Sequence, residues 1–214
     1  MSFFNFPSEF VYWDKVENHD EIKMEILPKI LEIAKKTKNN PFECCKFNTG
    51  FTRCENDNND KNGFLMSVKI EDIIIKHLIK MRNKYNNQSN YFKINDGISM
   101  ITNGWWNVYQ EGDFQEEHVH LGEPIYNENM FFYPSFSIIY ILHDENEESS
   151  IIFKKPAPVT LMKPFQPVEF STSVDKTIGE GTILIFPCNL SHLVKPCIKP
   201  GRVTLAYNVY STFE

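Results

Sequence analysis

Three histidines and one arginine in the second half of the chain are the residues whose types and spacing could do chemistry. His118 and His120 are two positions apart, so in an extended segment both imidazoles face the same side. His192 follows the apolar run 183–187, and Arg202 comes ten positions later. Imidazole nitrogens bind first-row transition metals well, and a buried guanidinium requires a carboxylate or phosphate partner. The set predicts a mononuclear metal site, with Fe(II) as the metal, beside an anion anchor.

Each of these residues also has a simpler interpretation. A lone H-x-H pair in a β-protein is often exposed to solvent, and Arg202 after Pro200-Gly201 could be a solvated turn residue. Thr204 alternates with Arg202, so both side chains would face the same side of a strand. The order of the whole set favours the metal site over these alternatives.

The elements that must position these residues are mainly short strands preceded by two helices. Amphipathic helices are expected from about His19 to Lys38, kinked at Pro28 or beginning just before it, and at 68–85, where His77 on the buried stripe is interpreted as a core residue. Strands are expected at 97–102, 105–110, 117–120, 136–142, 151–154, 168–171, 182–186, 192–195 and 203–210.

This pattern predicts a mainly β protein with N-terminal helices and a jelly-roll core. We expect a single domain over residues 1–214, in which residues 1–90 form a helical or irregular part that packs on the core formed by residues 91–214. Trp105-Trp106 is expected to supply one core residue and one residue at the rim of the site.

Composition and charge exclude some classes of function. With 214 residues, 42% of them hydrophobic, the chain is typical of a globular protein with a sizeable core. A net charge of −6 makes nucleic acid or an anionic membrane an improbable partner. No signal peptide and no membrane-spanning apolar stretch are visible, so we expect a cytoplasmic protein, in the host cytoplasm if its source is viral.

The five cysteines do not form a disulfide pattern. Reduced thiols are therefore the expected state. Cys44, Cys45 and Cys54 form a weaker alternative, a zinc site, because neither a second CxxC pair nor a nearby histidine completes the ligand set.

The motifs of the C-terminal half resemble those of the 2-oxoglutarate- and Fe(II)-dependent oxygenases, in particular the short members found in phage and bacterial genomes. The resemblance covers residues 106–208, and the N-terminal half carries no matching motif. It rests on W-N-V-Y-x-x-G-D-x-Q-x-x-H-x-H at 106–120, S-x-x-Y-x-L at 137–142, G-T-I-L-I-F-P-x-x-L-x-H-x-V-x-P at 181–196 and R-V-T-L-A-Y-N at 202–208.

This resemblance implies a double-stranded β-helix in which His118, His120 and His192 hold Fe(II). It also implies an oxidoreductase, a hydroxylase that uses O2 and couples decarboxylation of 2-oxoglutarate to oxidation of a C–H bond. The substrate, a small molecule or a side chain, is not identified by the sequence. Implied contacts of 2-oxoglutarate are Arg202 on its distal carboxylate and, as hydrogen-bond partners, Thr204, Tyr140 and Asn107.

The second ligand departs from the commonest pattern of that family, which has Asp or Glu where this chain has His120. Three imidazoles leave the metal one charge unit more positive than two imidazoles and a carboxylate. Glu123 is the alternative carboxylate ligand. Together with Gly112 and the histidine pair it also resembles the first cupin motif, which implies a metal-dependent enzyme that does not use 2-oxoglutarate. A non-catalytic jelly-roll binding or structural protein is a third alternative.

The segment 121–134 separates the histidine pair from the next expected strand and is rich in aromatic residues. We expect it to fold over the metal as a substrate lid, with Tyr126 and Tyr133 toward the substrate.

Overall fold

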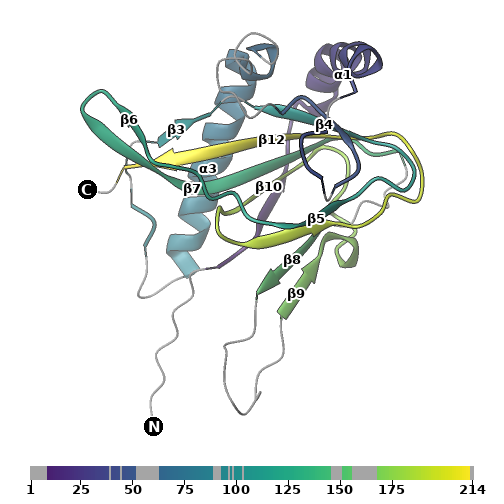
Figure 1. The fold of residues 1–214 in the computed structure, drawn as a ribbon. Helices are drawn as coiled ribbons and strands as arrows, with labels where there is room; N and C mark the ends of the chain where they lie inside the picture. The colour runs from purple at the N-terminus through teal and green to yellow at the C-terminus, as the bar shows by residue number, and fades with distance from the viewer. Residues whose placement is uncertain are drawn as a thin grey trace.

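Two antiparallel β-sheets face each other, and two long helices lie against the outer side of the larger sheet (Figure 1). This arrangement is the mainly β jelly roll with N-terminal helices that the sequence predicts. The computed structural model describes residues 9–38, 40–43, 45–51, 63–88, 93–95, 97, 99–102, 104–145, 151–155 and 168–212.

The strands are divided between a larger and a smaller sheet. The larger sheet runs in the order β1 (Tyr12–Lys15), β10 (Thr182–Pro187), β7 (Met130–His143), β12 (Arg202–Ser211), β4 (Trp105–Tyr109) and β2 (Asn48–Thr49), with β3 (Ser99–Ile101) beside β12 and β6 (Ile125–Asn127) beside β7. The smaller sheet runs in the order β5 (Gln115–His118), β11 (Ser191–Val194), β8 (Ile151–Lys155) and β9 (Val168–Ser171). From β4 onward the chain crosses repeatedly from one sheet to the other, as a jelly roll requires.

Helix α1 (His19–Lys36) forms because isoleucines recur every four residues along one face, at Ile22, Ile26 and Ile30, and all three are buried. Acidic residues in its first turn and basic residues in its last turn complement the helix dipole. Pro28 lies inside the helix at an exposed position, where water can bond to the carbonyl that proline leaves unpaired. The predicted helix is therefore confirmed, and Pro28 does not end it.

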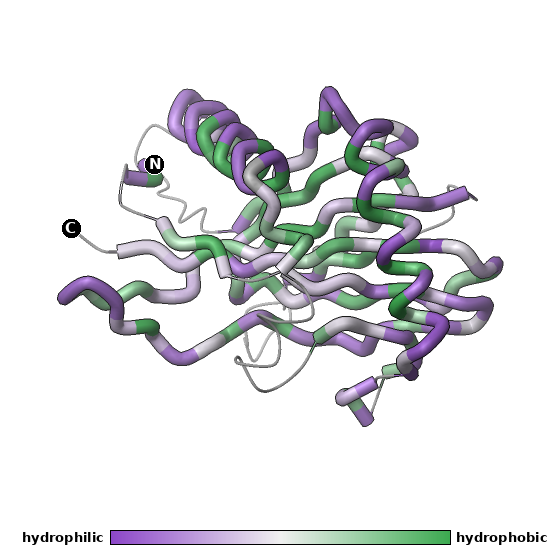
Figure 2. Tube along the Cα trace, turned by 90° about the horizontal axis from the view of Figure 1, so that it is seen from above, coloured by the Kyte–Doolittle hydropathy of each residue, from purple (hydrophilic) through white to green (hydrophobic). Residues whose placement is uncertain are grey.

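Helix α3 (Val68–Gln88) follows the short 3-10 turn η1 (Gly63–Met66). Its buried face carries Ile70, Ile74 and Met81 together with His77, which is 2% exposed and confirms the prediction of a core histidine. In Figure 2 the central strands are mainly hydrophobic, whereas both helices mix hydrophobic and hydrophilic residues, as expected for helices with one buried face. Within the described residues, neither helix is long and apolar enough to cross a membrane.

Strict alternation along β7 divides its side chains between two hydrophobic cores. Ile138, Tyr140 and Leu142 face the helices, whereas Ile139 and Ile141 belong to the core that includes residues of the smaller sheet. Neighbouring strands follow the same rule, because successive side chains of a strand point to opposite faces.

On β12 the same alternation separates packing from polar residues. Val203, Leu205, Tyr207 and Val209 pack against the helices. The intervening positions face a cavity between the sheets, and they are Arg202, Thr204, Ala206, Asn208 and Tyr210. One strand therefore carries the helix-side core on one face and the wall of the candidate site on the other.

Candidate metal centre and anion pocket

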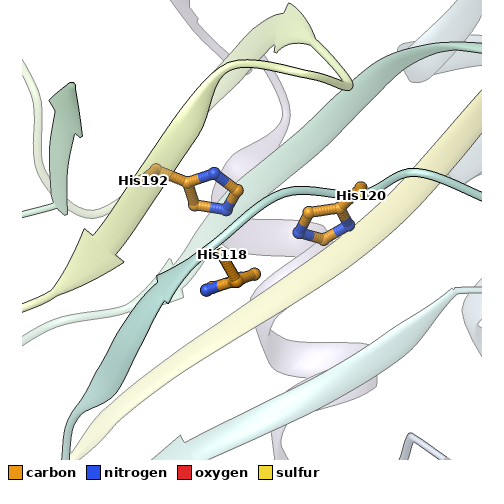
Figure 3. A group of neighbouring side chains, drawn as sticks. All are labelled: His118, His120 and His192. Atoms are coloured by element: carbon orange, nitrogen blue, oxygen red, sulfur yellow. The ribbon is translucent and has the colours of Figure 1, made fainter. Parts of the chain in front are cut away.

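Three histidines meet at the end of the small sheet nearest the cavity (Figure 3). His118 is the last residue of β5, and His192 on β11 is its direct cross-strand partner. The register between the two strands shifts immediately after this pair, between His192 and Val194, and such irregularities are frequent next to active sites. His120 follows two residues after His118, and one ring nitrogen from each histidine lies within 4.8 Å of the others.

Each histidine has a hydrogen-bond acceptor beside its Nδ1 atom. The His118 Nδ1 lies 2.7 Å from the Glu116 carbonyl, and the His192 Nδ1 lies 3.0 Å from the Leu190 carbonyl. The His120 Nδ1 lies 3.0 Å from the side-chain Oδ1 of Asn208. An acceptor at Nδ1 favours the tautomer that carries its proton there, so the lone pair of each Nε2 is left to bind a metal.

The environment keeps all three rings neutral at physiological pH. Burial lowers the pKa of His118, and burial together with the neighbouring His118 lowers the pKa of His120 to about 4. Burial and the other two rings hold the pKa of His192 well below its usual value. Because only a neutral imidazole can ligate a metal, these shifts favour metal binding over protonation.

Aromatic side chains hold the rings in place. Trp105 stacks on His120 with ring centroids 5.9 Å apart, and Phe186 contacts His192 edge-on with centroids 4.8 Å apart. Trp105 is half-buried and lines the cavity, whereas Trp106 is 1% exposed and lies in the core. The predicted division of the tryptophan pair into one rim and one core residue agrees with this arrangement.

Arg202 lies in the wall of the same cavity, which has a volume of about 600 Å³. Arg202 is only 3% exposed, its guanidinium forms no ion pair with a carboxylate in the described part of the chain, and the thiol of Cys197 is its polar neighbour. The guanidinium carbon lies 5.3 Å from the centre of the Tyr109 ring, a cation–π contact that offsets part of the cost of burial. A buried cation in this condition is prepared for an anionic ligand.

A short hydrogen-bond relay orients a hydroxyl group beside Arg202. Thr49 Oγ1 lies 2.7 Å from Asn107 Oδ1, which directs the Asn107 amide nitrogen toward Thr204 Oγ1 at 3.4 Å. Thr204 Oγ1 thereby accepts one bond, and its own proton is left to donate to the neighbouring Tyr109 hydroxyl or to a ligand. The structure thus brings Arg202, Thr204 and Asn107 to one wall of the cavity, as the sequence predicts.

Tyr109 belongs to this wall but was not among the predicted site residues. Its ring is fully buried against Arg202, its hydroxyl lies beside Thr204, and burial raises its pKa above the usual value, so it stays a neutral donor. It lies two residues from Asn107 on β4, so both side chains project from the same face. The spacing of two residues from Asn107 could therefore have identified Tyr109 as a site residue from the sequence.

Tyr140, in contrast, does not reach the cavity, and this prediction needs correction. Its hydroxyl lies 2.6 Å from His19 Nδ1 on helix α1, and its ring belongs to the helix-side core. The cause is the alternation along β7, which directs Ile139 to the cavity and Tyr140 to the opposite face.

Glu123 is exposed and does not join the group of metal-binding side chains among the described residues. The structure therefore brings together three imidazoles without the alternative carboxylate. The Cys45 Sγ accepts a hydrogen bond from the Glu116 amide at 3.4 Å, and the other two cysteines of the zinc alternative, Cys44 and Cys54, lie outside the described residues.

The segment expected to be a lid forms a β-hairpin, and its Leu121 and Gly122 line the cavity. Strands β6 and β7 are joined by Glu128 and Asn129, which both have positive φ, as a tight two-residue hairpin turn requires. Tyr126 and Tyr133 lie on the exposed face of this hairpin and do not line the cavity. Ile125, on the other face, does line it.

No protein-family model matches the sequence, and no curated protein matches it. Solved structures do match it. A prolyl-4-hydroxylase from Pseudomonas putida covers 97% of this chain and 94% of its own, with a TM-score of 0.53 and 12% identity. HygX from Streptomyces hygroscopicus, solved with nickel and 2-oxoglutarate bound, covers 95% of this chain and 83% of its own, with a TM-score of 0.55 and 9% identity. SnoK, a non-heme alpha-ketoglutarate-dependent carbocyclase from nogalamycin biosynthesis, covers 95% of this chain and 80% of its own, with a TM-score of 0.58 and 6% identity.

These similarities extend over nearly the whole chain, but the sequence identities are low. What the chain shares with these proteins is the fold. The predicted resemblance to 2-oxoglutarate- and Fe(II)-dependent oxygenases is therefore confirmed at the level of architecture.

Proposed function

We propose that this protein is a 2-oxoglutarate- and Fe(II)-dependent oxygenase that hydroxylates a small molecule or a side chain. One observation carries the proposal. The buried guanidinium of Arg202, which has no carboxylate partner among the described residues, lines the same cavity as three neutral histidines whose Nδ1 atoms are engaged and whose Nε2 lone pairs are left to bind a metal. A metal site alone would not require a buried cation beside it.

The three histidines fit a divalent first-row transition metal. Their donors are imidazole nitrogens, they come from two paired strands and the segment that follows β5, and each is oriented by an acceptor at Nδ1. When bound, Fe(II) would supply the O2 chemistry that couples decarboxylation of 2-oxoglutarate to oxidation of a substrate C–H bond. The protein's part is to hold the rings neutral and to keep the coordination set open on the cavity side.

Arg202, Thr204 and Tyr109 fit the distal carboxylate of 2-oxoglutarate. The guanidinium would pair with this carboxylate, while the two hydroxyls would donate hydrogen bonds to it. Burial strengthens these bonds because the surrounding medium screens charge poorly. The neighbour HygX, whose solved structure contains nickel and 2-oxoglutarate, supports this assignment by fold.

An anaerobic titration tests the proposal directly. Metal-free protein would receive Fe(II) and then 2-oxoglutarate, while the visible spectrum is followed for the weak metal-to-ligand charge-transfer band. The band is expected after the second addition. Succinate release under O2 would then serve to screen candidate substrates.

The alternatives give different results in the same titration. If Fe(II) binds but 2-oxoglutarate produces neither a band nor a change in affinity, the metal site stands and the co-substrate assignment is wrong. If no metal binds, the oxygenase proposal is wrong altogether.

A further inference from the structure

His120 is held differently from the other two histidines of the cluster. His118 and His192 lie on strands, and each has the backbone carbonyl two residues before it as its Nδ1 acceptor. His120 lies beyond the end of β5, and its Nδ1 acceptor is the side chain of Asn208 on β12. Its orientation therefore depends on a residue that is distant in sequence and that a point substitution can change.

Asn208 is itself fixed in the middle of the large sheet. Its backbone carbonyl accepts bonds from the amide of Thr102 at 2.9 Å and from the hydroxyl of the same residue at 3.2 Å. On its other side Asn208 is the register partner of Ser137 on β7, whose Oγ lies 3.5 Å from Asn208 Oδ1. A side chain anchored in this way can hold an imidazole in one orientation.

We propose that Asn208 is a positioning residue for the metal centre. Its Oδ1 holds the proton of His120 on Nδ1 and directs the Nε2 lone pair toward the space shared with His118 and His192. An outer partner of this kind fixes both the tautomer and the orientation of a ligating ring. The inference rests on the metal site of the proposed function and not on 2-oxoglutarate.

An imidazole ligand at position 120 needs such an outer partner, whereas a carboxylate ligand would not. A carboxylate ligand needs no tautomer to be selected, whereas an imidazole binds the metal through Nε2 only when its proton lies on Nδ1. Trp105 restrains the plane of the His120 ring by stacking, but its apolar face does not select a tautomer. Asn208 supplies that selection.

Three substitutions separate positioning from general structure. Asn208→Leu keeps the branched shape of the side chain and removes the acceptor, while Asn208→Asp keeps an acceptor oxygen. Ser137→Ala is the matched control, because it removes the other neighbour of the same amide oxygen without touching the ring. Thermal unfolding of each metal-free variant establishes that it is folded.

Two measurements are needed, and one does not require metal. Co(II) affinity is determined anaerobically by competition with a chelator. The tautomer of His120 is read from long-range ¹H–¹⁵N NMR spectra of the metal-free protein at pH 8, where the ring is neutral.

We expect Asn208→Leu to weaken Co(II) binding by about 10- to 100-fold and to shift His120 toward the Nε2–H tautomer. Asn208→Asp should recover the affinity, and Ser137→Ala should change it less than about threefold. Equal affinities for wild type and a folded Asn208→Leu would overturn the inference. So would an Asn208→Asp protein as weak as the leucine variant, or an Nε2–H ring in the wild type.

Failure of the proposed function would look different. A wild-type protein that binds no Co(II) would refute the metal site. The tautomer comparison would still decide whether Asn208 sets the position of the His120 proton.

Discussion

At the scale of single residues, Arg202 shows how the site differs from the rest of the core. Burying a cation is costly unless an anion pairs with it, and no such partner exists among the described residues. The contact with Tyr109 offsets only part of this cost. We therefore expect the ligand-free protein to be less stable with Arg202 than with an apolar side chain, and the proposed anionic ligand would supply the missing partner.

Replacing Arg202 by Met should consequently separate stability from binding. Affinity for 2-oxoglutarate is expected to fall by about 100-fold or more, because a charge-assisted contact to its distal carboxylate is lost. Metal affinity should change little. The free energy of unfolding of the ligand-free protein should rise by about 1–2 kcal/mol, as replacement of buried ions by apolar groups often does.

Calorimetric titration of the metal-loaded protein and denaturant unfolding measure these two effects. Co-substrate affinity equal to that of the wild type would remove Arg202 from the proposed role.

Glu180 is a second charged residue whose surroundings dictate its behaviour. Burial alone would raise its pKa, but hydrogen bonds from Lys23, the Asp144 amide, His143 and His19 outweigh burial and hold the pKa at about 2. This folded-state pKa lies below the usual value near 4.5. The carboxylate therefore stabilises the fold above about pH 4.5, and the contribution disappears as the pH falls toward 2.

Glu180→Gln is expected to cost about 1–2 kcal/mol of unfolding free energy at pH 7, a value discounted for partial solvent exposure. The cost should shrink as the pH is lowered from 5 to 3. Urea unfolding of both proteins across this range measures it. A cost that stays constant over the whole range would show that the charge of Glu180 is not responsible.

At the scale of elements, β12 shows how much of the site could be predicted from the sequence. Side chains two positions apart on this strand face the same side, so Arg202 and Thr204 were expected on one face. Counting on in steps of two from Thr204 would also have placed Asn208 on that face. Which β7 side chains face the cavity could not be predicted from the sequence, because nearly all central residues of this strand are apolar or aromatic and both of its faces are buried. Tyr140 was assigned to the wrong face for that reason.

The hairpin of β6 and β7 was missed for another physical reason. Its turn uses Glu128 and Asn129 in the left-handed region without a glycine, so the usual Asn-Gly or Asp-Gly signal is absent. The helices, in contrast, were predicted to within a few residues, because each has a single buried stripe at helical spacing.

Helix α1 offers a direct test of its packing on the large sheet. Ile30 is fully buried and Met24 is 72% exposed, so the same helix provides both the test and its control. Ile30→Ala should cost about 2–4 kcal/mol of unfolding free energy, and Met24→Ala less than about 0.5 kcal/mol. Co(II) affinity of the folded variants should not change. Denaturant unfolding measures the costs, and equal values for the two variants would contradict the packing described.

At the scale of the whole molecule, the helices, the large sheet and the small sheet form successive layers. The large sheet is supported on both sides, whereas the metal ligands come from the small sheet and the segment that follows β5. The metal should therefore act on the small sheet more than on the helices. The assignment of residues 1–90 as a part that packs on a core of residues 91–214 stays a prediction.

Metal binding should protect β5 and β11 from hydrogen exchange. At a free Co(II) concentration of 100 times the dissociation constant, binding adds about 2.7 kcal/mol to the stability of every state that keeps the site intact. Amide hydrogen exchange is expected to slow in β5 and β11 and much less in α1. His192→Ala should abolish metal binding and the protection together. Protection spread evenly over all described elements would contradict a local effect.

The direct pairing of His118 with His192 has a consequence for the lifetime of the protein. These residues are far apart in sequence, so an ion held between them closes a long loop of the chain, as a disulfide would, but reversibly. We expect removal of the ion to weaken this closure, because the two short strands are then joined only by their own pairing. Under the proposed function, metal starvation would not only stop catalysis but also expose the chain to proteolysis, and the supply of metal would then set how long each molecule survives.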